Sequence, residues 1–142
     1  MFGKSQTEGL IAQAKQQRDL GNRSGSLDLY REAAVQARAL SDNVLLAHIL
    51  RHVGELATQL DLLDEAEQAI AEAADLYATL EPPDTLSQAN THRLAALLAV
   101  KLNRTAQAVI HWQAARTRYA ALDIDAGVAE CDRRLAQASV QG

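Results

Sequence analysis

Residues 54–73, GELATQLDLLDEAEQAIAEA, carry the residue pattern that best predicts the fold of this chain. It places small residues at Gly54 and Ala66, a large apolar residue at Ile70 and an alanine at Ala73. The same order recurs on both sides of it, and the two further sets are Ala14/Ser26/Tyr30/Ala33 and Ala96/Ala108/Trp112/Ala115. The second small residue of each set stands at position 26, 66 or 108, so the spacing is first 66 − 26 = 40 and then 108 − 66 = 42. Such a period is typical of stacked helix pairs that each contact mainly their neighbours.

Hydrophobic periodicity and helix-ending residues predict an all-α chain of seven helices, since no segment alternates with strand period. The predicted ranges are about 5–20, 25–40, 44–60, 61–80, 84–102, 105–122 and 124–139. The segment Ser41-Asp42-Asn43 can cap the third helix and Asp84 the fifth. Asp61 or Asp64 is expected to cap the fourth helix, and Asp123 or Asp125 the seventh. Glu81-Pro82-Pro83 separates the fourth helix from the fifth because proline cannot continue a helix.

The composition of the chain is typical of a helical protein without disulfide bonds. Apolar residues make up 48% of the chain but aromatic residues only 4%, as expected of Ala/Leu-rich helices. The single cysteine, Cys131, allows no disulfide framework, and its acidic neighbours Glu130 and Asp132 are expected to raise the pKa of the thiol. We expect no secretory leader and no membrane-spanning segment, and hence a cytoplasmic location.

The net charge of −4 is unevenly distributed, because residues 41–83 hold nine acids against Arg51 alone. Seven of these acids have no basic neighbour in sequence: Asp61, Asp64, Glu65, Glu67, Glu72, Asp75 and Glu81. An acidic stretch repels phosphate backbones, so we expect no nucleic-acid partner. A solvated outer helix face is the favoured interpretation, ahead of a docking site for a basic protein.

The three sets of small, large and alanine positions resemble the framework of the tetratricopeptide repeat. The resemblance covers residues 8–122 and departs from the family in its period, since the family unit is about 34 residues long and the sets here recur at the longer spacing given above. It also lacks the aromatic residue three positions after the first small one, where Gln17, Ala57 and Ala99 stand. The resemblance implies one domain over 1–142, a right-handed superhelical stack of antiparallel pairs. Its repeats would be about 5–40, 42–80 and 84–122, followed by a capping helix over about 124–139.

The resemblance further implies a concave groove lined by the first helix of each pair, which would bind a peptide or helix of a partner protein. The groove-facing candidates are Lys15, Arg18, His48, Arg51, Glu55, Gln59, Asn90, Arg93 and Lys101, with Glu8, Ile11 and Leu97 beside them. Arg51 and Arg93 hold equivalent positions and could offer forked donors to carboxylates. One family subtype clamps a C-terminal carboxylate with lysine and asparagine, and this chain carries none of that set.

Two alternatives stay open. The chain could be a self-associating structural module, since helix stacks end in open apolar edges that a homodimer would cover. His48, His52 and Glu55 share one helical face and could hold a metal ion, although no metal or other cofactor is required by any motif. His92 is expected to pack with a hydrogen-bonded ring nitrogen, and His111 to lie near the surface. No phosphate loop or nucleophile elbow is present, so the sequence favours a scaffold or adaptor over an enzyme.

Overall fold

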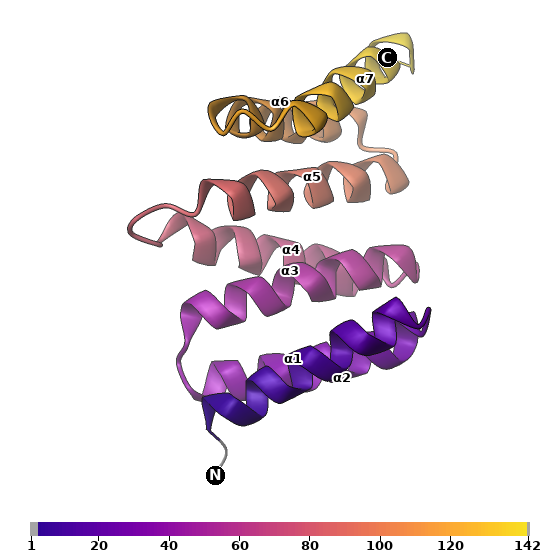
Figure 1. Ribbon diagram of the computed structural model, residues 1–142. Coiled ribbons are helices and arrows are strands. Elements are labelled where there is room, and N and C mark those ends of the chain that lie inside the picture. The colour runs from indigo at the N-terminus through magenta and orange to yellow at the C-terminus, as the bar shows by residue number, and fades with distance from the viewer. Residues whose placement is uncertain (1–2, 142) are drawn as a thin grey trace. The chain divides into compact units, whose positions relative to one another are not determined.

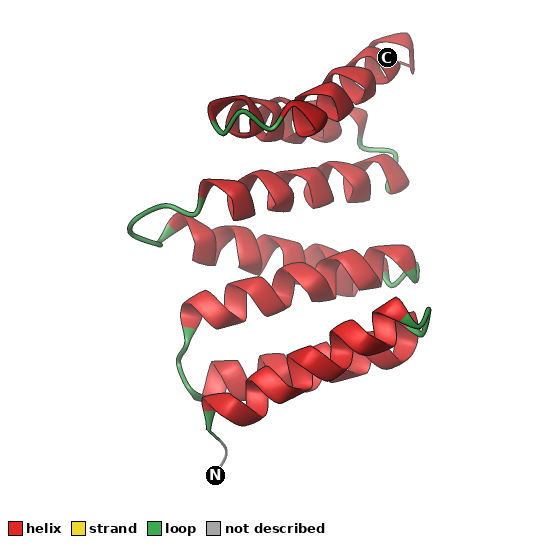
Figure 2. Cartoon of the chain, viewed as in Figure 1, coloured by secondary structure: helices red, strands yellow, loops and turns green. Residues whose placement is uncertain are grey.

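The structure, a computed structural model, describes residues 3–141 and is helical throughout, with no strand in that range. Figure 1 shows the helices on each side of Glu81-Pro82-Pro83 running back and forth, and Figure 2 shows the short connections between them. The helices are α1 (Lys4–Asp19), α2 (Arg23–Ala39), α3 (Asn43–Gln59), α4 (Leu63–Ala78), α5 (Thr85–Lys101), α6 (Thr105–Ala121) and α7 (Asp125–Gln141). The predicted all-α class and the seven helices are confirmed over the described range, and α7 runs beyond its predicted end near residue 139.

Among the described residues, five of the connections share one turn, whose central residue has a positive φ of 54–84°. These central residues are Gly21, Ser41, Asp61, Asn103 and Asp123. In each turn the next residue donates its N–H to the carbonyl five residues earlier, as Leu62 does to Ala57 at 2.8 Å, which satisfies an open end of the helix. That same residue immediately precedes the following helix, so the reversal is tight.

This turn corrects part of the predicted capping. Asp61 and Asp123 are turn residues with positive φ, and Asp64 and Asp125 lie inside the first turns of α4 and α7. Aspartate tolerates the left-handed region better than most residues, which is why it occupies the turn. The cap predicted at Asp84 is confirmed, since its carboxylate accepts from the N–H of Ser87 at 3.0 Å. Within Ser41-Asp42-Asn43 the capping residue is Asp42, which accepts from the N–H of Leu45 at 3.1 Å.

The chain divides after Leu76 into two compact units, here called unit 1 (to Leu76) and unit 2 (from Tyr77). In unit 1, α1 packs on α2 and α2 on α3. The Ser26 hydroxyl donates to the Ala14 carbonyl at 2.7 Å across the first pair. A Cβ at Gly54 would lie 2.4 Å from Ile70 Cγ1, so α3 and α4 meet too closely there for any side chain. The absence of a side chain at Gly54 is therefore what permits this contact between the two helices.

Unit 2 packs α5 on α6 and α6 on α7. Trp112 is 1% exposed and forms a core cluster with Tyr119 and Cys131. A Cβ at Gly127 would lie 2.5 Å from Tyr119 Cγ, so this glycine lets α7 lie against α6. Burial, with its two acidic neighbours, raises the pKa of the Cys131 thiol. All twelve framework residues of the three sets are buried, as their spacing predicted.

The acidic stretch is partly neutralised by the fold. Arg31 of α2 binds Glu65 of α4 with two hydrogen bonds of 2.5 and 2.8 Å, and Arg38 binds Glu72 at 2.7 and 3.0 Å. These hydrogen bonds hold the pKa of both glutamates below its usual value. Two of the acids without basic neighbours in sequence therefore acquire them in space, from a helix earlier in the chain.

No helix within residues 3–141 combines the length and the apolar character needed to cross a membrane.

Candidate interaction site

The candidate residues of unit 1 gather on α1 and α3, the first helices of two successive pairs. Lys15 and Arg18 lie one helical turn apart on α1. His48, Arg51 and Glu55 lie on successive turns of α3. Residues three and four apart share a helix face, so each helix presents its members in one direction. The structure brings these five residues together around a sixth, His52, which the sequence had placed only in a possible metal set.

Arg18 joins the two helices. Its Nη1 lies 3.2 Å from His52 Nδ1 and 3.9 Å from Glu55 Oε1. Because a guanidinium can only donate, His52 Nδ1 accepts, and the neutral ring carries its proton on Nε2. The side chains of Arg18 and Glu55 are 29% and 31% exposed, so the cluster is open to water on one side.

Tyr30 forms the floor of the cluster. Its ring stacks on His52 with centroids 5.0 Å apart and planes inclined by 12°. The Tyr30 side chain is fully buried, and its hydroxyl has no hydrogen-bond partner within residues 3–141. Burial raises the pKa of Tyr30, and the charges of Arg18, Glu55, Arg51 and Asp19 act on it as well. The buried hydroxyl therefore lies close beneath the charged face of α1 and α3.

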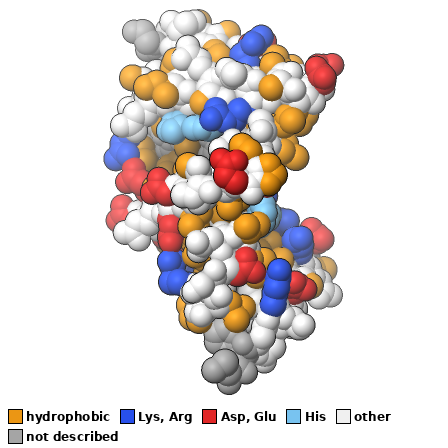
Figure 3. Space-filling view, turned by 90° about the vertical axis from the view of Figure 1, so that its left-hand side faces the viewer, with side chains coloured by type: hydrophobic (Ala, Val, Ile, Leu, Met, Phe, Trp, Pro, Cys, Tyr) orange, Lys and Arg blue, Asp and Glu red, His pale blue; other side chains and the backbone are white. Residues whose placement is uncertain are grey.

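The electrostatics of the cluster keep His52 neutral. Burial lowers the pKa of His52 to about 3, and the nearby charges of Arg51, Arg18 and Lys15 contribute to this shift. These three cations face Glu55 and Asp19, so the cluster carries an excess of positive charge within an acidic chain. Figure 3 shows histidine side chains at the surface in two places, with basic side chains beside them.

The other candidates are placed differently. Gln59, the last residue of α3, is exposed, and so is Lys101, the last residue of α5. Asn90 accepts a 2.6 Å hydrogen bond from the hydroxyl of Tyr119 and so ties α5 to α6. Arg93 donates from Nε and Nη2 to the two oxygens of Glu130 on α7, at 2.5 and 3.1 Å. The forked donor predicted at Arg93 thus holds a carboxylate of the chain itself, and the pKa of Glu130 is lowered by it.

The metal set considered above, His48, His52 and Glu55, lies within the described residues. No three metal-ligating side chains converge within residues 3–141. His52 and Glu55 both face the cation of Arg18, which disfavours a metal ion between them. In unit 2, His92 Nδ1 lies 3.0 Å from His111 Nδ1, so one neutral ring donates to the other. The expected ring hydrogen bond of His92 is confirmed, and burial lowers its pKa to about 4.

Sequence reasoning missed the role of Tyr30 beneath the cluster and of Glu130 as the partner of Arg93. Glu130 is far from Arg93 in sequence, and no local pattern marks such a distance. The repeat pattern marks Tyr30 as a large apolar position, but its stacking partner His52 lies on the next helix. A leucine directly follows five of the described helices, at regular spacing: Leu20, Leu40, Leu60, Leu102 and Leu122. This spacing is a sequence signal that could have aligned equivalent positions of successive helices.

The chain matches no protein-family model, and comparisons with curated proteins and with solved structures return no significant match, so its family is not shown by similarity to known proteins.

Proposed function

We propose that the chain is a protein-interaction module of tetratricopeptide-like helical repeats, a scaffold or adaptor that acts in the cytoplasm. It would bind an acidic segment of a partner protein on the face of α1 and α3. The observation that carries the proposal is the cluster of Lys15, Arg18 and Arg51 around the neutral ring of His52.

The chemistry of the cluster suits a carboxylate-bearing segment. Guanidinium groups pair with carboxylates through two parallel hydrogen bonds, and the ammonium of Lys15 adds a mobile donor. His52 and Tyr30 hold their rings in a fixed stack, so little side-chain freedom is lost when a partner docks. Glu55 supplies the opposite charge, which would fix the register of a segment that carries both signs.

The experiment is a selection from a peptide-display library, followed by titration of the enriched peptides. The proposal predicts enrichment of Asp/Glu-containing peptides. It also predicts that Lys15→Glu/Arg51→Glu weakens their binding by about tenfold or more, equivalent to roughly 1.4 kcal/mol. The matched control is Arg23→Glu/Arg133→Glu, which makes the same change of charge at two exposed arginines outside the cluster.

Equal binding by the native chain and the Lys15→Glu/Arg51→Glu variant would contradict the site. If no peptide is enriched and light scattering shows a mass that doubles with concentration, the homodimer replaces the adaptor as the function.

A further inference from the structure

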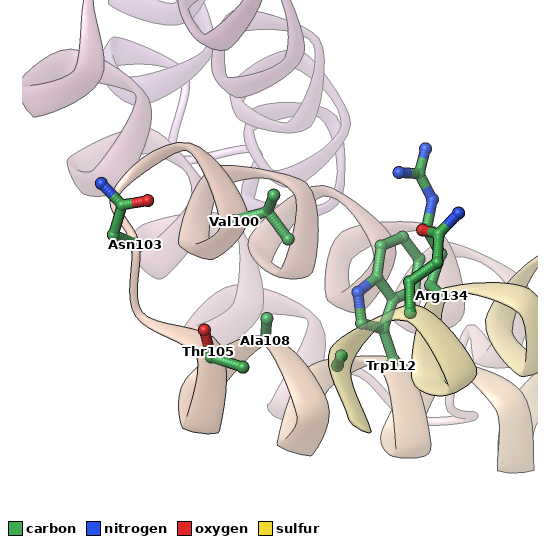
Figure 4. Close-up of a pocket in the computed structure, with 8 residues that line it drawn as sticks. Val100, Asn103, Thr105, Ala108, Trp112 and Arg134 are labelled. Atoms are coloured by element: carbon green, nitrogen blue, oxygen red, sulfur yellow. The ribbon is translucent and has the colours of Figure 1, made fainter. Parts of the chain in front are cut away.

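A pocket of about 280 Å³ lies in unit 2, next to the turn that joins α5 to α6. Figure 4 shows Val100, Asn103, Thr105 and Ala108 on one side of it, with Trp112 and Arg134 on the other. This size is below that of a site for a drug-sized molecule and suits a small acid or amide. No acidic side chain is among the residues that line it.

Trp112 presents an unused donor to this pocket. Its side chain is 1% exposed, and its indole N–H has no acceptor within residues 3–141. In Figure 4 the nitrogen edge of the ring is turned toward Ala108 and Thr105, across the pocket. Among the described residues the Tyr30 hydroxyl is the buried side-chain polar atom that lacks a partner, so the indole N–H of Trp112 is open to the pocket, where an acceptor would take the place of water.

Arg134 supplies a cation at the same end. Its guanidinium carbon lies 5.6 Å from the centre of the Trp112 ring, and no carboxylate pairs with it in the described part of the chain. The nearby carboxylate of Glu130 already accepts both hydrogen bonds from Arg93. Arg134 is therefore held in place by the indole and retains its hydrogen-bonding capacity.

The first turn of α6 adds positive electrostatic potential to the pocket, as Arg134 does. The residue at its N-cap is Arg104, whose side chain makes no capping hydrogen bond, and the turn contains no acid. Unpaired N–H groups at a helix start favour an anion. Thr105 and Ala108, which line the pocket, belong to this end of the helix.

The corresponding place in unit 1 shows what the pocket lacks. Trp112 corresponds to Tyr30, Arg134 to His52 and Val100 to Arg18, with one common offset in sequence number (112 − 30 = 134 − 52 = 100 − 18 = 82). In unit 1 the long side chain of Arg18 contacts both His52 and Glu55. In unit 2 the short side chain of Val100 replaces Arg18, and Gln137 replaces Glu55. The space that Arg18 fills in unit 1 is therefore open in unit 2, and no carboxylate takes the place of Glu55 beside Arg134.

We propose that this pocket binds a small carboxylate anion with a compact apolar body, such as an aromatic carboxylic acid. One carboxylate oxygen accepts from the indole N–H of Trp112, and the carboxylate is neutralised by Arg134. The apolar body lies against Val100, Ala108 and Ala138. The site shares no residue with the cluster on α1 and α3, so the two proposals stand or fall separately.

The test uses the fluorescence of Trp112, the only tryptophan of the chain. The native protein is titrated with benzoate, with benzamide as the uncharged analogue and with inorganic phosphate as a compact anion. We expect a saturable change with benzoate and binding of benzamide that is weaker by about tenfold or more, the loss typical of one charged hydrogen bond.

Two variants and a control locate the site. Arg134→Gln removes the cation and is expected to weaken benzoate binding by about tenfold, whereas Arg133→Gln, at an exposed neighbour, leaves it unchanged. Ala138→Leu fills the pocket without a change of charge and is expected to abolish binding. Affinities are confirmed by calorimetry, and circular dichroism checks that each variant is folded.

The proposal is overturned if benzoate produces no saturable change, if benzamide binds as well as benzoate, or if Arg134→Gln binds like the native protein. Tighter binding of phosphate than of benzoate would overturn the assignment to carboxylates and identify an inorganic-anion site.

Discussion

In unit 1 the ring of Tyr30 lies under His52, and in unit 2 its counterpart Trp112 lies under Arg134. Both pairs join the second helix of a pair to the helix that follows, with the same separation in sequence number (52 − 30 = 134 − 112 = 22). The histidine is neutral and closed in by Arg18, whereas the arginine is charged and borders a pocket. One backbone arrangement therefore supports a filled cluster or an open site, depending on the residues at 18 and 100.

The histidines of unit 2 give a second comparison between matched positions of the two units. His92 and His111 of unit 2 contact each other at the positions that Leu10 and Leu29 occupy in unit 1, with the same offset in sequence number (92 − 10 = 111 − 29 = 82). Two leucines thus stand in unit 1 at the positions where unit 2 has a polar contact, and all four positions are helical. Substitutions at matched positions can therefore separate the interactions that stabilise the shared helical framework from those that are specific to one unit.

The largest effect is expected from Trp112→Ala. Removal of a fully buried aromatic side chain leaves a cavity and should lower the free energy of unfolding by about 3–5 kcal/mol. Urea unfolding followed by circular dichroism measures it. Val140→Ala, at an exposed position of α7, is the control and should change stability little. A loss below about 1 kcal/mol for Trp112→Ala would mean that the core cluster is loosely packed.

Gly54→Ala should cost about 1–3 kcal/mol, because the new Cβ would stand 2.4 Å from Ile70 Cγ1. The equivalent position of the next set is Ala96, where a methyl group is already accommodated. Urea unfolding of Gly54→Ala, Ile70→Ala and the double variant measures the coupling. Additive losses would contradict a direct clash, since the double variant should lose less than the two single losses combined.

Acid should destabilise unit 1 through His52. Below pH 6.5 the unfolded chain protonates this ring, but the native ring stays neutral until about pH 3. The unfolded state therefore binds more protons, and stability falls as the pH falls, with a slope approaching about 1.4 kcal/mol per pH unit. Unfolding free energies measured across this range should show a shallower slope for His52→Phe, which preserves the stack on Tyr30.

His92→Leu is the matched variant in unit 2, because it restores the residue type found at Leu10. Its slope should also decrease, since burial lowers the pKa of His92 to about 4. Unchanged slopes in both variants would place the acid sensitivity in the carboxylates bound by arginine instead.

A transplant of the unit 1 residues should close the pocket of unit 2. Val100→Arg/Gln137→Glu reproduces Arg18 and Glu55 around Arg134 and places a carboxylate of the chain itself beside the cation. We expect benzoate binding to weaken by about tenfold, or roughly 1.4 kcal/mol, in the fluorescence titration. Undiminished binding would show that residues 100 and 137 do not control access to the pocket.

The smallest effect concerns the surface pair of Arg38 and Glu72. Both side chains are well exposed, so Arg38→Ala should cost only about 0.2–1 kcal/mol. Urea unfolding at low and high salt tests it, because salt screens such pairs and should remove the difference. A loss that persists at high salt would point to packing of the arginine stem in place of its charge.

The helices, and the closeness of adjacent ones, follow from local sequence patterns. Small residues at fixed spacing allow close approach, and large apolar residues fill the space between helices, as Gly54 and Ile70 show. Capping residues before an apolar run predicted the starts of α3 and α5, since that signal is local. It failed at Asp61 and Asp123, where the turn geometry used the same residue type differently.

Which polar side chains meet depends, in contrast, on how the helices pack. Arg18 and His52, Arg31 and Glu65, and Arg93 and Glu130 are all partners that lie far apart in sequence. Such pairs depend on how far one helix slides along another, and a long side chain can reach several positions on its neighbour. The helical period predicts the face of the helix on which a residue lies. Its partner across the interface depends on how the two helices pack and on the free-energy cost of removing water from each charge.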